Sequence, residues 1–137
     1  MYSSLQKTIK DIIELDGIGL HNGKNVNICL KPAEANSGIT FKRTDVSGNN
    51  IIEATYKNVS SSLLCTKIEN SFGTSVSTIE HLMGAFYGEG IDNAVVEVDN
   101  KEVPIMDGSA KIFVEKFLDV GFELSQTPIK LIKITNR

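Results

Sequence analysis

The stretch from Ser77 to Asn93 constrains the fold of this 137-residue chain more than any other part. Its apolar residues fall at i, i+3, i+4, i+7 and i+8, which is the spacing of one face of an α-helix. They are Ile79, Leu82, Met83, Phe86 and Tyr87. Ser77 and Glu80 form an S-x-x-E pattern, which predicts a capping box at the helix start, and Gly88 and Gly90 predict its end.

The side of this predicted helix away from the apolar stripe carries small residues. At about 100° per residue, that side holds His81, Gly84, Ala85 and Gly88. A glycine on an exposed helix surface costs roughly 1 kcal/mol relative to alanine, so two of them favour close packing of another element. We therefore predict a helix covered on both faces, with Glu80 and His81 at one end of the seam. Left uncovered, the side would favour self-association.

Composition and charge exclude several classes of protein. The chain is 41% hydrophobic and 23% charged, which is typical of a globular domain with a core. A net charge of -3 argues against a nucleic-acid-binding surface. No run approaches the roughly 18 apolar residues of a membrane span, and residues 1–10 lack the apolar core of a signal peptide. With only Cys29 and Cys65, a disulfide framework is not expected, and we predict a cytoplasmic protein.

Alternating segments on both sides of the helix predict strands. Those before it are residues 8–15, 26–30, 38–44, 51–56, 63–69 and 74–77, and one after it is 93–99. Asn22-Gly23 predicts a tight turn, so the first two segments should form a hairpin. A second amphipathic helix is expected between Ser109 and Gly121. This order predicts an α+β fold, a sheet of about five strands with two helices packed on one face.

Glu80 and His81 place a carboxylate next to an imidazole at the predicted helix start. In one interpretation Glu80 caps Ser77 and His81 is a polar helix-end residue. In the other, Glu80 is a general base beside a metal-binding His81. A catalytic zinc takes three protein ligands, but the chain has no H-E-x-x-H pattern, and H-x-x-E-H would need a histidine at position 77. Further ligands must therefore come from outside this segment.

Three other residues each have a purely structural interpretation. His21 lies at the expected hairpin tip, Cys65 is compatible with a small buried apolar residue, and Asp107 with a turn. The predicted 63–77 hairpin leads directly into the helix, so Leu64 and Cys65 should lie near the helix start.

Five segments, taken in order, resemble one enzyme family. They are Gly19-Leu20-His21-Asn22-Gly23-Lys24, Leu64-Cys65-Thr66, Ser77-Thr78-Ile79-Glu80-His81-Leu82, Gly90-Ile91-Asp92-Asn93 and Pro104-Ile105-Met106-Asp107-Gly108-Ser109. The sequence is similar to the zinc-dependent UDP-3-O-acyl-N-acetylglucosamine deacetylases of lipid A biosynthesis. Asn22 departs from the pattern, since the family often has a small hydroxyl residue there.

The resemblance implies residue roles. His81 would be the first zinc ligand, and Glu80 the general base acting on zinc-bound water, which attacks the N-acetyl carbonyl of UDP-3-O-acyl-N-acetylglucosamine. Leu64 and Cys65 match a substrate-binding segment beside the sugar and the metal. His21 and Asp107 match polar substrate-side positions near the site.

The resemblance also implies a two-domain protein. The family packs two similar α+β domains around the active site, so residues 1–125 would be the N-terminal domain, and 126–137 a linker and the first strand of a second. That domain would cover the Gly84/Ala85/Gly88 side and supply the other zinc ligands, from an H-x-x-x-D motif, and a histidine acid. We expect this chain alone to be inactive and to bind metal weakly at most. The alternative is a non-catalytic binding or assembly module, while an RNA-binding domain is disfavoured by the acidic balance.

Overall fold

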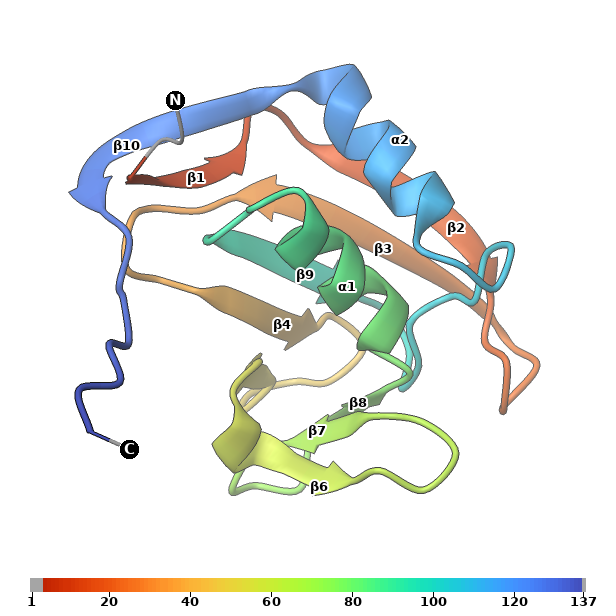
Figure 1. Cartoon of the computed structure of the whole chain (residues 1–137). Coiled ribbons are helices and arrows are strands. Elements are labelled where there is room, and N and C mark those ends of the chain that lie inside the picture. The colour runs from red at the N-terminus through yellow and green to blue at the C-terminus, as the bar shows by residue number, and fades with distance from the viewer. Residues whose placement is uncertain (1–3, 137) are drawn as a thin grey trace.

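The computed structural model describes residues 4–136, and its centre is a five-stranded sheet (Figure 1). The strands run in the order β2 (Ile13–Ile18), β3 (Asn25–Pro32), β9 (Ala94–Val98), β4 (Ile39–Arg43) and β5 (Ile51–Glu53). β4 and β9 are parallel, and the other neighbours are antiparallel. The predicted α+β fold with a sheet of about five strands is confirmed.

Two helices, α1 (Glu80–Gly88) and α2 (Lys111–Val120), cover one face of this sheet, as predicted (Figure 1). The strands alternate in burial, and the covered face holds the core residues Ile13, Leu15, Val26, Ile28, Leu30, Phe41, Val96 and Val98. The helices meet through Phe86 and Phe117, whose rings stack with centroids 5.1 Å apart. The other face is polar, and there Lys31 and Glu97 form an ion pair of 2.7 Å.

The hairpin predicted from Asn22-Gly23 is present between β2 and β3. Gly23 has a φ of 65°, a left-handed conformation that glycine adopts without steric cost. The second helix also lies where expected. The Ser109 hydroxyl accepts the Lys111 N–H at 3.1 Å, and Gly121 follows the last turn with a φ of 83°.

Two small sheets flank the central one. β1 (Leu5–Ile9) pairs with β10 (Phe122–Pro128), and β6 (Val59–Ser61), β7 (Lys67–Glu69) and β8 (Ser75–Ser77) form the other, after a 3-10 turn at Tyr56–Asn58. The single strand expected over residues 8–15 is wrong, because the chain divides it into β1 and β2. β6 was not predicted.

The C-terminal end of the chain also differs from the expectation. The expected strand after Pro128 is not formed in residues 129–136, and the domain boundary expected at residue 126, which falls inside β10, stays a prediction. A strand needs a neighbour to take up its backbone hydrogen bonds. In this segment the Ile129 N–H donates to the Ser4 carbonyl at 2.7 Å, next to the last pair of β1 and β10.

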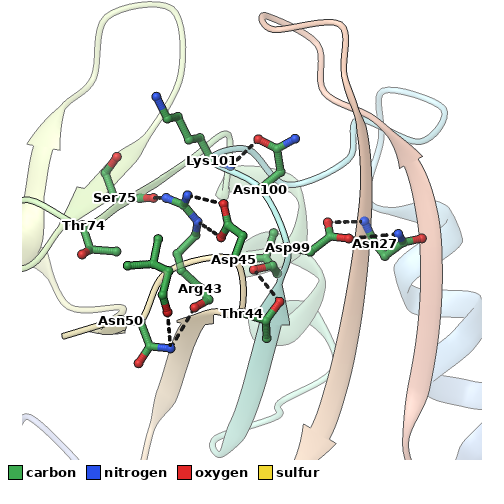
Figure 2. A network of polar contacts seen from close by, with 12 residues as sticks. Asn27, Arg43, Thr44, Asp45, Asn50, Thr74, Ser75, Asp99, Asn100 and Lys101 are labelled. Carbon is green, nitrogen blue, oxygen red and sulfur yellow. Dashed lines mark hydrogen bonds and ion pairs between the residues drawn. The ribbon is translucent and has the colours of Figure 1, made fainter. Parts of the chain in front are cut away.

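Arg43 ties the three-stranded sheet to the central one (Figure 2). Arg43 is 5% exposed, and its guanidinium donates two hydrogen bonds of 2.7 Å to Asp45 and one of 2.8 Å to the Ser75 carbonyl. The hydrogen bond from Arg43 lowers the pKa of the Asp45 carboxyl. Since Ser75 begins the strand that leads into α1, this contact helps to fix the start of the helix.

The orientation of α1 corrects two expectations. Tyr87 is 90% exposed and lies outside the apolar stripe, while Ala85 is 1% exposed and belongs to the core. The buried face of α1 is centred between Leu82 and Phe86, so Ala85 points toward the core and Tyr87 points toward solvent.

The side of α1 with the two glycines is open within the described chain. Gly84 and Gly88 are exposed, and a Cβ built on either would meet no other segment within 4 Å. The predicted cover on both faces is therefore not supplied by residues 4–136, and Ala85 is not part of the open side.

Candidate functional site

The candidate site begins where β8 turns into α1. The Ser77 N–H donates to the Lys101 carbonyl at 2.8 Å, and the Val103 N–H donates to the Ser77 carbonyl at 3.1 Å. Thr78 follows, 1% exposed and with a φ of 60°. A β-branched residue in this left-handed region costs about 1–3 kcal/mol unless its surroundings hold it there. The sharp turn brings Glu80 into the first turn of the helix.

Glu80 is held by the loop that precedes β7. Its Oε2 accepts the Thr66 N–H at 3.0 Å, and the Ile79 N–H approaches the Thr66 carbonyl at 3.4 Å. The predicted capping box is wrong, because Ser77 belongs to β8 and its N–H is bonded to Lys101 instead. The Glu80 carboxylate thus secures a loop rather than the helix start.

The same contact brings Leu64 and Cys65 beside the start of α1, as the hairpin predicted. Cys65 is half-buried, and it directly precedes Thr66. Leu64 is 84% exposed and has a φ of 62°. An exposed apolar side chain therefore lies two residues before the backbone N–H that Glu80 accepts.

His81 follows Glu80 on the helix and is half-buried. Within residues 4–136, no three histidine, cysteine, aspartate or glutamate side chains gather closely enough to hold a metal ion. A catalytic zinc requires three protein ligands, so the donors of this chain do not by themselves fit one. Any metal at His81 needs ligands from outside the described residues.

His21 lies at the tip of the β2–β3 hairpin, where sequence analysis expected it, and is exposed. The turn is closed by a 3.0 Å bond from the Gly23 N–H to the Gly19 carbonyl. The His21 N–H donates to the Glu102 carboxylate at 3.0 Å, so the backbone of the tip is anchored to a different segment.

Asp107 lies in the loop before α2 and has a local role. Its Oδ1 accepts the Ser109 N–H at 3.0 Å and the Ser109 hydroxyl at 2.9 Å. These hydrogen bonds, the backbone one first, lower the pKa of the exposed Asp107 carboxyl. The contacts match the turn interpretation, and they are directed at Ser109 rather than at Glu80 or His81.

Sequence analysis missed Glu102, the carboxylate that joins these segments. It is 2% exposed and accepts hydrogen bonds from the Thr78 hydroxyl at 2.6 Å and from the backbone of His21 and Asn22 at 3.0 and 3.2 Å. Glu102, Val103 and Pro104 are all buried, so no alternation marks Glu102 as inward. The available signal was its position just before the Pro104–Ser109 motif.

Comparisons with known proteins converge on one description. Residues 6–137 match the family model described as "LpxC: UDP-3-O-acyl N-acetylglycosamine deacetylase". A UDP-3-O-acyl-N-acetylglucosamine deacetylase of Vibrio parahaemolyticus is 45% identical over 129 residues. The proteins of that name from Pseudoalteromonas atlantica and Vibrio cholerae are 48% and 44% identical. Each match covers 94% of this chain and 42% of the relative, so the chain spans less than half the length of these relatives.

Among the described residues, no helix is both long enough and apolar enough to cross a lipid bilayer.

Proposed function

Because the chain belongs to the UDP-3-O-acyl-N-acetylglucosamine deacetylase family, we propose that it forms the N-terminal part of such an enzyme. The complete enzyme would remove the N-acetyl group from UDP-3-O-acyl-N-acetylglucosamine, in lipid A biosynthesis. The observation that supports this best is the Glu80–His81 pair at the start of α1, beside a side of the helix that residues 4–136 leave open.

In the proposed reaction, Glu80 is the general base. The Thr66 N–H occupies its Oε2, which fixes the carboxylate and leaves Oε1 to accept a proton from water. The water oxygen adds to the acetyl carbonyl carbon, the C–N bond breaks, and acetate and a free amine are formed. The proton that the amine needs would come from an acid outside this chain.

His81 is proposed as one ligand of a zinc ion whose other ligands lie outside residues 4–136. The exposed Gly84 and Gly88 would then receive the second domain, since their lack of side chains permits close approach of a partner. Leu64, Cys65, His21 and Asp107 are proposed to lie on the substrate side. Cys29 and Cys65 are both free thiols, which supports a cytoplasmic location.

A hybrid enzyme tests this function. It joins the present chain to the C-terminal part of the Vibrio parahaemolyticus relative that the match does not cover. The hybrid should contain zinc and deacetylate UDP-3-O-acyl-N-acetylglucosamine, whereas the 137-residue chain alone should do neither. Glu80→Gln should lower kcat by about 10²–10⁴-fold with zinc retained. His81→Ala should lower the zinc content.

Glu89→Gln is the matched control, since Glu89 lies at the other end of the same helix. It should leave both kcat and zinc content close to those of the unaltered hybrid. A folded hybrid without zinc or activity would instead support the non-catalytic module, and full activity in Glu80→Gln would remove Glu80 from the mechanism.

A further inference from the structure

Glu102 joins the tip of the β2–β3 hairpin to the segment that leads into α1. Thr78, at the entry to α1, donates its hydroxyl proton to Oε2 at 2.6 Å. At the hairpin tip, the His21 N–H approaches both carboxylate oxygens, at 3.0 and 3.2 Å, and the Asn22 N–H donates to Oε1 at 3.2 Å. One buried carboxylate thus holds residues that lie far apart in the sequence.

The site around Glu102 is specific for an acceptor that has two oxygens. All the groups directed at it are donors, so an ionised carboxylate satisfies them, whereas an amide would turn an N–H₂ group toward one of them. The chain also makes room for it at Gly19, where an added Cβ would clash with Oε1 of Glu102 and with Oδ1 of Asn22. The burial of the Glu102 side chain, the donors directed at its oxygens and the absence of a side chain at Gly19 all favour a carboxylate at this position.

The hydrogen bond between Thr78 and Glu102 also affects the segment that carries Glu80 and His81. Its φ of 60° is unfavourable for threonine, and the hydrogen bond to Glu102 is one of the contacts that hold it there. Two residues later comes Glu80, and then His81. The same carboxylate therefore restrains both the direction in which α1 starts and the position of the His21 segment.

We propose that Glu102 is a positioning residue, which sets the His21 segment in register with the start of α1. The effect on catalysis that this inference implies rests on the proposed function, whereas the placement of the two segments does not. Glu102 itself takes no part in bond making or breaking, and its effect on catalysis passes through His21 and Thr78.

The first test uses the 137-residue chain and amide NMR. Glu102→Gln should make the His21 and Asn22 amides exchange about tenfold faster and shift the Glu80 and His81 amide resonances. The protected Ile28 amide in the central sheet should not change. Glu97→Gln, on the polar face of the sheet, is the control and should alter neither region.

A matched pair at Thr78 keeps the test valid even if Glu102→Gln unfolds. Thr78→Ser retains the hydroxyl and should leave the Glu80 and His81 resonances near their original positions, while Thr78→Val removes it and should shift them. Equal spectra for the serine and valine variants would overturn the proposal, as would unchanged His21 exchange in a folded Glu102→Gln protein.

The second test measures kinetics in the hybrid enzyme. Glu102→Gln should raise KM about tenfold, and His21→Ala should do so as well, with little further loss when both are combined. Fully additive effects would assign Glu102 a general structural role and overturn the proposal while leaving the deacetylase function intact. An inactive unaltered hybrid would contradict the proposed function instead, and the NMR outcomes would still decide the role of Glu102 in placing the two segments.

Discussion

The Thr66 backbone N–H and the Glu80 carboxylate form a hydrogen bond of 3.0 Å between the loop before β7 and the start of α1. The donor is a main-chain group, so the contact survives changes of the Thr66 side chain. It also directs Oε2 of Glu80 at the protein, and in the proposed reaction the other oxygen accepts the proton.

Replacing the Thr66 amide should weaken catalysis without touching Glu80. In the hybrid enzyme, Thr66→Pro removes the N–H, and a hydrogen bond to a charged group contributes roughly 1.5–3 kcal/mol. We expect kcat to fall by about 10–100-fold. Thr66→Ala keeps the N–H and should stay within a few-fold of the unaltered hybrid, so equal losses in the two variants would refute a role for this bond.

The open side of α1 should tolerate side chains in this chain but not in a two-domain protein. Gly84→Ala should stabilise the 137-residue chain by roughly 0.5–1 kcal/mol, because a Cβ there meets no other segment and alanine favours the helix. Urea denaturation measures this.

Gly84→Leu extends the same test to the hybrid enzyme. The bulkier side chain should leave the short chain folded and lower the activity or stability of the hybrid, if the second domain packs on this side. An unaffected hybrid would show that the second domain lies elsewhere.

Asp45 should contribute to the acid sensitivity of the fold. The Arg43 hydrogen bond lowers the pKa of its carboxyl in the folded state, so its stabilisation is present above the unfolded pKa near 3.8 and is lost as pH falls below that. The side chain is 37% exposed, which limits the effect to about 1 kcal/mol or less. Asp45→Asn should therefore reduce stability at pH 7, and the difference from the unaltered chain should shrink as the pH is lowered below 3.8, by urea denaturation at each pH.

The stacked pair Phe86 and Phe117 should account for much of the packing of α1 on α2. Phe117 is 0% exposed, and truncating a buried phenylalanine to alanine costs about 3–5 kcal/mol. Phe117→Ala should lower the urea midpoint strongly. Leu118→Ala, at an exposed neighbouring position, is the control and should change it little.

Local chemistry made the central features predictable. The Asn22-Gly23 turn and the alternation of Val26, Ile28 and Leu30 depend on neighbouring residues alone, and the β2–β3 hairpin formed as expected. The core stripe of α1 was predictable through Leu82 and Phe86, because these large side chains define its inward direction.

Long-range contacts account for what could not be predicted. The S-x-x-E pattern at Ser77 indicated a capping box, but the partners of Ser77 and Glu80 are Lys101 and Thr66, which no local pattern reveals. The burial of Glu102 depends likewise on donors brought from two remote segments. Ala85 is small enough to suit either side of a helix, so its burial follows from the way the larger side chains of α1 pack on the core.

Glu80 and His81 are consecutive residues in one helical turn. Any rigid tilt or slide of α1 carries the carboxylate and the imidazole together, so the spacing between them is preserved. In the proposed two-domain enzyme, such a movement would change the distance of the pair from the second domain and leave the pair itself intact.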